Sequence, residues 1–254
     1  MERSALPHPG PDPLLTGRRA PSRARPRRAA PRTGDVSFRR WYEALFRAYG
    51  PQGWWPGRSR FEVIVGAYLT QNIAWSNVAR ALRNLRKARL LHPGRMRRAG
   101  AGVVANLIRP SGYYNQKAER LLVFVRLLEE RHGGSLDHLF GRPLEVVRRE
   151  LLDLPGVGPE TADSILLYAA NRPVFVIDAY TRRLLHRHGH LGRDEGYEDL
   201  RRRFEEALPA EVDLYNEFHA LIVRLAKERC RSGIPDCRGC PLEPFLPPSG
   251  PRRD

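Results

Sequence analysis

One carboxylate is set apart by the residues around it. Asp178 follows four apolar residues in the stretch RPVFVIDAYTRRLL and precedes a segment with helical spacing. A buried, fixed carboxylate of this kind can stabilise developing positive charge or activate a water molecule. Asp is equally common as the residue that caps the first turn of a helix. The two roles are compatible, and the residues alone leave both open for Asp178.

A glycine turn lies upstream of that aspartate. In the stretch LPGVGPETADSILLYA, Gly156 and Gly158 bracket Val157, and an apolar helical stripe follows. Glycine permits backbone angles that other residues avoid and lets another backbone come close. Pro159 suits the first turn of a helix, whose free amides and positive dipole end can bind an anion such as phosphate. An ordinary packing corner between two helices is the alternative.

Three cysteines stand near the C-terminal end, with the spacing Cys-x6-Cys-x2-Cys. They are Cys230, Cys237 and Cys240. Three cysteines do not make a disulfide framework. The six-residue gap also disfavours a structural zinc site.

The charge balance points to a polyanionic partner. The chain of 254 residues has 44 Lys and Arg against 28 Asp and Glu, a formal net charge of +16. Such a balance favours nucleic acid as the partner, although a genome with a codon bias towards Arg would give the same composition. No run resembles a signal peptide or is long enough to span a membrane. We therefore expect a cytoplasmic, nucleoid-associated protein without a membrane partner.

The chain divides into a tail and an ordered part. Residues 1–34 are rich in Pro, Arg and Ala and too poor in apolar residues to fold, so we expect a disordered basic tail. It is either an arm that holds phosphates or a passive extension. After Asp35, apolar residues recur with helical spacing and strict two-residue alternation is absent, which predicts an all-α protein. The stretches that show this are WYEALFRAY, NVARALRNL, NQKAERLLVFVRLLEERHG, LEVVRRELLDL and YNEFHALIVRLAKERC.

Turn, apolar segment and aspartate together resemble the endonuclease III (HhH-GPD) superfamily of DNA glycosylases. Its helix-hairpin-helix reads Leu-Pro-Gly-Val-Gly, two variable positions and Thr-Ala, followed by an apolar segment and an essential aspartate. The resemblance extends from about Trp41 to Cys240. It implies a two-lobed helical fold with a central cleft for DNA. One lobe would be residues 56–172, ending in the hairpin, and the other residues 35–55 plus 173–254.

The resemblance also assigns roles around the hairpin. Asp178 would be catalytic, and the hairpin would contact DNA through Leu154, Gly156, Val157, Gly158, Glu160 and Thr161. Bifunctional relatives carry a lysine in the hairpin that attacks C1′ and leads to strand cleavage. Glu160 occupies that position here, and a carboxylate cannot form a Schiff base. We therefore expect a monofunctional enzyme that uses water and has doubtful lyase activity.

Two further stretches favour the branch of 3-methyladenine glycosylases that resembles endonuclease III. In LTQNIAWSNV, Gln71 would fill the gap left by a flipped base and Asn72 would contact DNA, unless the pair only caps a helix. GYYNQKA also suits this branch, which stacks cationic alkylated bases on aromatic side chains. The candidates for that base pocket, each alternatively a core residue, are Trp54, Trp55, Pro56 and Trp75.

The family's iron–sulfur loop would continue to a fourth cysteine, but that position is Leu246. The incomplete set leaves three alternatives: a four-iron cluster with an oxygen ligand from Asp236 or Glu243, a three-iron cluster, or a loop without metal.

As a whole, the sequence predicts a monomeric glycosylase of base excision repair that acts on double-stranded DNA with a damaged, alkylated base. The alternatives are a bifunctional glycosylase and lyase for oxidised pyrimidines, and a non-catalytic DNA-binding protein that uses the same hairpin.

Overall fold

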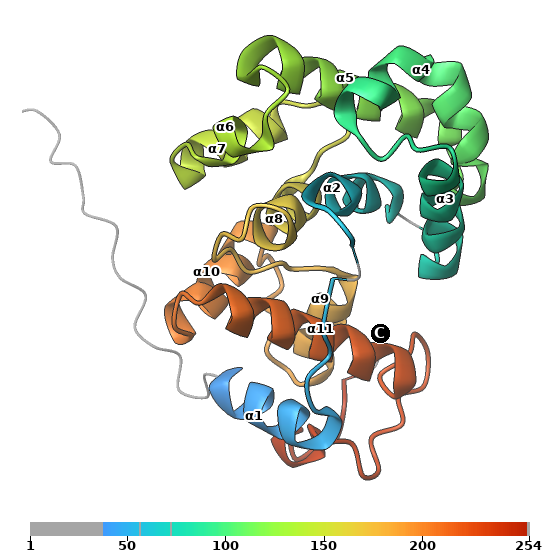
Figure 1. Cartoon of the computed structure of the whole chain (residues 1–254). Helices are drawn as coiled ribbons and strands as arrows, with labels where there is room; N and C mark the ends of the chain where they lie inside the picture. Colours follow the sequence, from blue (N-terminus) through green and yellow to red (C-terminus); the bar gives the residue numbers. More distant parts are fainter. Residues whose placement is uncertain (1–37, 56, 72, 253–254) are drawn as a thin grey trace, which may run out of the picture. The chain divides into compact units, whose positions relative to one another are not determined.

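The computed structural model describes residues 38–55, 57–71 and 73–252 (Figure 1). Within these ranges all regular structure is helical, which confirms the predicted all-α class. The tail 1–34, Pro56 and Asn72 lie outside the described residues. The helices are α1 (Phe38–Tyr49), α2 (Arg60–Leu69), α3 (Trp75–Lys87), α4 (Pro93–Leu107), α5 (Tyr114–His132), α6 (Leu136–Phe140), α7 (Leu144–Leu152), α8 (Pro159–Tyr168), α9 (Ala179–Arg187), α10 (Tyr197–Ala207) and α11 (Val212–Glu228), with short 3₁₀ turns at Arg109–Ser111 and Glu243–Phe245.

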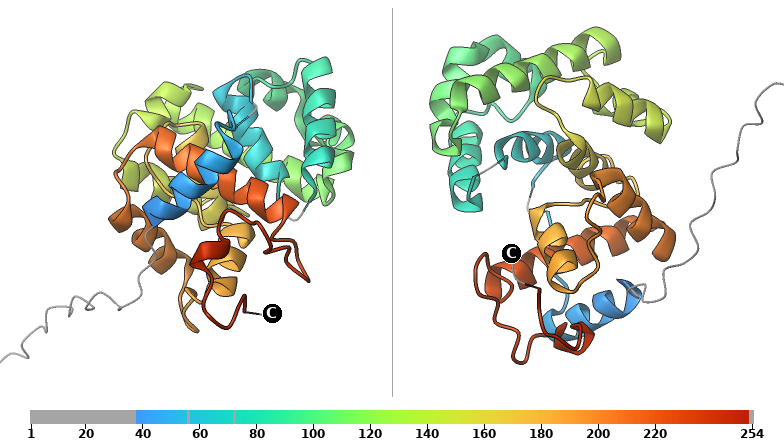
Figure 2. Two further views of the ribbon diagram at one scale, coloured as in Figure 1. Left: turned by 90° about the horizontal axis from the view of Figure 1, so that it is seen from below. Right: turned by 180° about the vertical axis from the view of Figure 1, so that it is seen from behind.

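The described helices form two groups joined through α8. Helices α2 to α5 pack on one another, whereas α1, α9 and α10 gather around α11 (Figures 1 and 2). Helix α8 contacts α2 and α7 on one side and α11 on the other. The residues that follow α8 therefore pass between the two groups. The lobe boundaries given above remain a prediction.

The segment before Asp178 runs through the core of the second group. Val174, Phe175, Val176 and Ile177 are all buried. The Phe175 ring stacks on Phe204 of α10 with 4.1 Å between ring centroids. Burial of such aromatic and branched side chains stabilises each by about 1.5–3 kcal/mol. The segment is thereby held in place up to the residue where α9 begins.

The hairpin, residues 153–158, joins two helices that are also linked by a buried ion pair. The guanidinium of Arg148 on α7 donates two hydrogen bonds to the carboxylate of Asp163 on α8, at 2.7 and 3.1 Å. Gly156 has φ +74°, which L side chains rarely adopt, so glycine is needed at this turn. Helix α8 then begins at Pro159, as the sequence predicts.

Lys117 connects two loops at one end of the first group. Its ammonium is buried and donates to the carbonyl oxygens of Leu69 (2.9 Å), Gln71 (3.2 Å) and Ser111 (2.8 Å). Three acceptors match the three donors of an ammonium group. This lysine therefore holds the end of α2 and the loop after it against the turn that precedes α5.

Candidate active site

Asp178 is the N-cap of α9 and is only 8% exposed. Its Oδ1 accepts hydrogen bonds from the backbone N–H of Thr181 at 2.7 Å and from the Thr181 hydroxyl at 2.9 Å. Burial alone would raise the pKa of Asp178, but the neighbouring His219 and these hydrogen bonds outweigh it and leave the pKa below its usual value. The capping role is thus present, and Oδ2 is left for other partners.

His219 of α11 lies behind that carboxylate. Its Nε2 is 3.4 Å from Asp178 Oδ2, without the alignment of a hydrogen bond. Its Nδ1 is 2.5 Å from the hydroxyl of Tyr168 at the end of α8. The tyrosine hydroxyl can donate to Nδ1, and in that tautomer Nε2 carries the proton that faces Asp178. Residues of α8, α9 and α11 therefore meet at this acid.

A pocket of about 380 Å³ opens in front of Asp178. Ligand sites are typically concave, largely apolar and furnished with a few polar groups, and this pocket has that character. Trp54, Trp55 and Trp75 lie close together in its wall, with ring centroids 5.2–5.8 Å apart. The lining residues are Trp54, Trp55, Ala67, Thr70, Gln71, Ile73, Ala74, Trp75, Ser76, Glu160, Thr161, Ser164, Val176, Asp178, Tyr180, His219, Val223 and Lys227.

The structure brings the three described tryptophan candidates to one place. Each is half-buried, with part of its ring facing the pocket, whereas the remaining tryptophan, Trp41, is fully buried in the core. Because Trp54, Trp55 and Trp75 also pack against the core, their role as a base pocket remains a prediction.

Glu160 lines the same pocket from the first turn of α8. Part of its side chain is open to solvent. Desolvation within the pocket, and then the negative charge of Asp178, raise the pKa of the Glu160 carboxyl above its usual value. The pocket thus contains two carboxyl groups whose pKa values are displaced in opposite directions, a pattern typical of catalytic sites.

Lys227 was not among the site residues predicted from the sequence. It comes from the last turn of α11, and its Nζ lies 5.8 Å from the centroid of the Trp54 ring. The side chain lines the pocket that contains Asp178. Because α11 is far from the hairpin in sequence, no local pattern indicated that an amine would reach this pocket.

Gln71 is folded back onto the hairpin. Its Nε2 donates to the Gly156 carbonyl at 2.8 Å and to the Thr161 hydroxyl at 3.0 Å. The side chain therefore bridges two loops in this structure. The alternative of a helix cap does not apply to it, because the C-cap of α2 is Thr70.

The other hairpin residues divide into anchors and exposed positions. The side chains of Leu154 and Val157 are buried, so they hold the turn in place. Gly156 and Gly158 are exposed, and the amides of the first turn of α8 have no acceptor within the helix. The side chain of Arg120 lies against Gly156, since a Cβ there would meet it at 2.4 Å. Any phosphate contact of the turn would be made by backbone amides next to this guanidinium.

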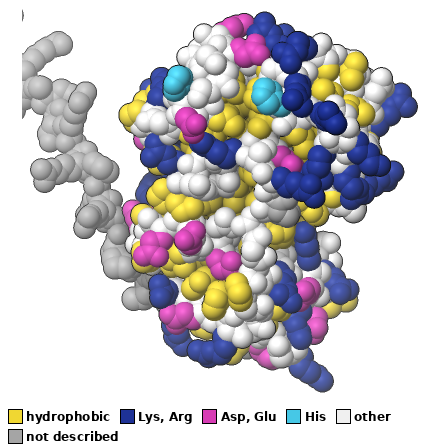
Figure 3. Space-filling model, in the orientation of Figure 1, with side chains coloured by type: hydrophobic (Ala, Val, Ile, Leu, Met, Phe, Trp, Pro, Cys, Tyr) yellow, Lys and Arg dark blue, Asp and Glu magenta, His cyan; other side chains and the backbone are white. Residues whose placement is uncertain are grey.

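Basic side chains gather on the surface of α3, α4 and α5, of which α3 begins at the pocket-lining Trp75. Figure 3 shows Lys and Arg side chains over the part of this face formed by α3, α4 and α5. The exposed basic residues of α3, α4 and the loop between them are Arg80, Arg83, Lys87, Arg89, Arg95, Arg97 and Arg98.

Tyr113 is a second residue that the sequence did not single out. It is 78% exposed and has φ +46°, in the left-handed region. Its neighbour Gly112 lies near Ile73, and Lys117 joins the same turn to the loop of Gln71. An aromatic ring is therefore presented to solvent next to the pocket-lining loop.

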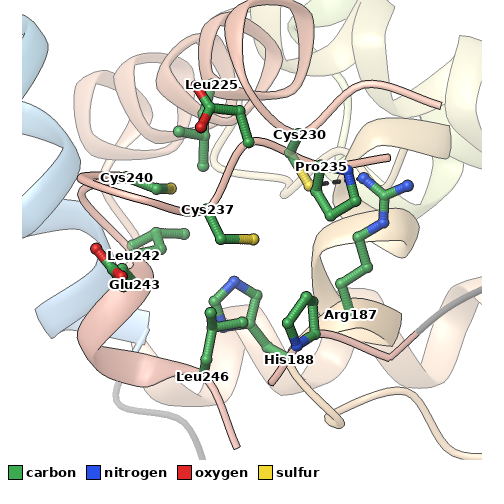
Figure 4. A pocket seen from close by; sticks show the side chains of 12 residues that line it. Arg187, His188, Leu225, Cys230, Pro235, Cys237, Cys240, Leu242, Glu243 and Leu246 are labelled. Carbon is green, nitrogen blue, oxygen red and sulfur yellow. Dashed lines mark hydrogen bonds between the residues drawn. The ribbon is translucent and has the colours of Figure 1, made fainter. Parts of the chain in front are cut away.

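The three cysteines line a separate pocket at the far end of α9 (Figure 4). His188, which follows α9, lines it together with Leu246 at the position of the missing fourth cysteine. The two carboxylates named above as oxygen ligands also line this pocket, but both are exposed and each already has a partner. Asp236 is 3.2 Å from Arg229, and Glu243 accepts a hydrogen bond from Gly239 N–H at 2.7 Å.

No helix among the described residues has the length and apolar character needed to cross a membrane.

Comparisons with known proteins agree with this geometry. A family model described as "HhH-GPD superfamily base excision DNA repair protein" matches residues 65–210. The chain is 42% identical over 205 residues to a protein of Methanocaldococcus jannaschii assigned as a DNA repair glycosylase, which covers 80% of this chain and 93% of that protein. It is 28% identical over 183 residues to endonuclease III of Thermotoga maritima, covering 72% and 80%.

Solved structures give the same picture. The crystal structure of 3-methyladenine DNA glycosylase from H. pylori, bound to 1,N6-ethenoadenine, matches with a TM-score of 0.66 and 30% identity over 76% of this chain and 97% of that one. A non-covalent complex of endonuclease III with DNA matches with a TM-score of 0.69, over 82% and 92%. At 21% identity, the second match bears on the fold alone.

Proposed function

The chain belongs to the HhH-GPD superfamily of base excision DNA repair proteins and is a DNA N-glycosylase, and from this premise we propose that it is monofunctional and removes alkylated bases. One observation carries the proposal. A single pocket contains Asp178, an aromatic wall and no amine from the hairpin itself.

Cleavage of an N-glycosidic bond builds positive charge on the sugar. Asp178 is buried and its pKa is lowered, so it is ionised at neutral pH and can stabilise that charge. Its Oδ1 is occupied by Thr181, which leaves Oδ2 to face the sugar or the attacking water. His219 and Thr181 hold the carboxylate in one orientation, which is the condition for a fixed charge to act in a transition state.

The aromatic wall supports the choice of an alkylated base. Alkylation at a ring nitrogen makes a purine cationic, and a cation over an indole ring gains about 1–2 kcal/mol when both are desolvated. Trp54, Trp55 and Trp75 offer such faces in a pocket large enough for a flipped base. The structure of the relative from H. pylori contains an alkylated adenine, 1,N6-ethenoadenine, which supports the same substrate class for this chain.

DNA is the binding partner in this proposal, and the damaged base enters the pocket. The hairpin amides, Arg120 and the exposed basic residues of α3 and α4 are suited to phosphates, which position a duplex without reading its sequence. Gln71 and Tyr113 stand on the two loops joined by Lys117, where they can occupy the space of an extruded base and stack on its neighbours. For this, Gln71 must exchange its bonds to the hairpin for contacts with DNA.

Release of free base tests the proposal. Duplexes with 3-methyladenine, thymine glycol or a mismatch are incubated in parallel with wild type, Asp178→Asn and, as a matched control, Asp213→Asn at an exposed position of α11. We expect release of 3-methyladenine by wild type and the control, and a loss of about 10²–10⁴-fold in Asp178→Asn with DNA binding retained. Release of thymine glycol without 3-methyladenine would refute the choice of substrate.

A second candidate, a bifunctional glycosylase and lyase, is supported by Lys227. Its amine lies in the same pocket as Asp178, where it could attack C1′ in place of the hairpin lysine of bifunctional relatives. Borohydride reduces the resulting Schiff base to a stable covalent adduct with DNA. Under the monofunctional proposal no adduct forms. An adduct with wild type and Lys87→Ala that is absent from Lys227→Ala would instead establish the lyase.

The third hypothesis, a non-catalytic DNA-binding protein, is not retained, because the family and the relatives above are repair glycosylases.

A further inference from the structure

The cysteine pocket contains one nitrogen donor that the sequence pattern does not show. Cys230, Cys237 and Cys240 and the ring of His188 surround the same space, and Leu246 lies beside the histidine (Figure 4). Leu246 has no atom that can bind a metal. His188 is 6% exposed and follows α9, so it comes to the pocket from a different segment of the chain than the cysteine loop.

The hydrogen bond of His188 leaves one ring nitrogen for a ligand. Its Nδ1 is 3.2 Å from the carbonyl oxygen of Phe245, to which it can only donate. Nε2 is then the acceptor nitrogen, and it makes no hydrogen bond to any described residue. Metal-binding histidines usually donate their second nitrogen to a backbone carbonyl in this manner. The carbonyl belongs to the residue that immediately precedes Leu246.

The arrangement is unlike a site for one ion. Among residues 38–55, 57–71 and 73–252, no three His, Cys, Asp or Glu side chains converge closely enough to hold a single metal ion. A zinc site would need its ligands about 2.0–2.3 Å from one point. A cluster of several irons binds its ligands at different metal atoms, so they stand farther apart. Three thiols and an imidazole around one space therefore fit an iron–sulfur cluster better than zinc.

We propose that this pocket holds a four-iron cluster whose ligands are Cys230, Cys237, Cys240 and Nε2 of His188, with the histidine in place of the missing cysteine. The proposal does not depend on the substrate proposed above. It differs from the expected oxygen ligands. Asp236 and Glu243 also line this pocket, but Asp236 is paired with Arg229 and Glu243 accepts a hydrogen bond from Gly239 N–H, whereas His188 Nε2 has no such partner among the described residues.

Arg187 supports the same pocket. Its guanidinium donates hydrogen bonds to the Cys230 sulfur at 3.2 Å and to the carbonyls of Arg231 and Gly233 at 2.7 Å each. It thereby braces the loop that contains the cysteines against the end of α9. Hydrogen bonds to ligand sulfur and a neutral imidazole in place of a thiolate both raise the reduction potential of a cluster.

Iron content and pulsed EPR of the full chain test the proposal. The protein is labelled with ¹⁵N-histidine, purified without oxygen and reduced. We expect about four irons and four sulfides per chain and a nitrogen hyperfine coupling of the size that direct ligation produces. His188→Cys should keep the iron, lose the nitrogen coupling and lower the reduction potential. His138→Ala, at an exposed histidine of α6, should change none of these.

Three outcomes would overturn the proposal: no iron in wild type, a cluster without nitrogen coupling, or a nitrogen coupling that persists in His188→Cys. Leu246→Ala distinguishes the effect of His188 from that of the neighbouring Leu246. This variant should leave the nitrogen coupling unchanged. Wild type and His188→Cys both have a side chain at position 188 that can bind iron. The result therefore does not depend on a variant that loses the cluster and fails to fold.

Discussion

His219 Nε2 lies 3.4 Å from Asp178 Oδ2, close enough for attraction but without the alignment of a hydrogen bond. The ring is held from its other side by Tyr168. Helix α11 therefore sets the orientation of an acid that belongs to α9. A positioning residue of this kind acts through the carboxylate and not on the substrate.

His219→Ala should lower the rate of base release by about 100-fold, because a small displacement of a catalytic group has an effect of that size. The KM for DNA should stay unchanged, since the His219 side chain is buried and offers DNA almost no surface. His219→Gln, which keeps an N–H donor, should recover part of the rate, and Tyr168→Phe should cause a smaller loss. Single-turnover kinetics measure this, and an equal loss in His219→Gln and His219→Ala would contradict the positioning role.

The lowered pKa of Asp178 predicts a dependence of stability on pH. A carboxyl whose folded-state pKa lies below its usual value contributes stability at pH above that value, and the contribution is lost as pH falls through the folded pKa. Asp178→Asn removes the titration. The difference in free energy of unfolding between wild type and Asp178→Asn should therefore shrink as pH falls below the usual value of 3.8, which urea unfolding at several pH values measures. A constant difference would contradict it.

Trp75 is expected to select cationic bases. Trp75→Leu removes an aromatic face worth about 1–2 kcal/mol to a cation, so kcat/KM for 3-methyladenine should fall by about 5–30-fold. Release of a neutral damaged base should fall less, and Trp75→Phe should keep part of the preference. Competition between the two bases in one reaction gives the ratio directly. A loss of equal size for both bases would assign Trp75 a role in packing alone.

Lys117→Met should affect stability and DNA affinity together. Three carbonyl oxygens lose their donor, and a buried polar group left unsatisfied costs about 1–3 kcal/mol. The loops of Gln71 and Tyr113 also lose their connection, so binding to damaged DNA should weaken. Arg47→Met, at an exposed position of α1 outside the basic set of α3 and α4, is the matched control. Unfolding in urea and a binding titration measure the two effects, and an unchanged affinity would show that the loops do not need this tether.

Asp163→Asn should destabilise the hairpin. Breaking a buried ion pair by removing one charge costs about 3–5 kcal/mol, because the other charge stays buried. Arg148 would be that charge. It is 8% exposed and would keep its pair with the half-exposed Glu198, so the loss should lie at the lower end of this range. Asp137→Asn breaks the exposed pair of Asp137 with Arg60 and should change the free energy of unfolding by less than about 1 kcal/mol. Comparable losses in the two variants would contradict the assignment.

Local patterns in the sequence were sufficient to predict that Asp178 follows a buried segment at the start of a helix, and that a glycine turn precedes it. The four apolar residues before the aspartate are buried and end at a helix N-cap, and Gly156 has the positive φ that its position demands. Each of these features depends on residues that are adjacent in the chain. Helical periodicity likewise was enough for the all-α class, since it reports one face of one element at a time.

The sequence did not predict three residues that line the two pockets, His219, Lys227 and His188. The same physical reason applies to all three. Each stands on or directly after a helix as an ordinary polar residue among others, and its neighbours in sequence say nothing of its partners in space. Packing of α11 against α8 and α9 brings the imidazole next to Asp178 and the amine into the same pocket. Packing of the C-terminal loop against the end of α9 brings a second imidazole to the cysteines. Chain-local patterns thus identify the acid, the turn and the helices, whereas the groups that surround the acid and complete the cysteine set depend on contacts between distant segments, which exist only after the helices have packed.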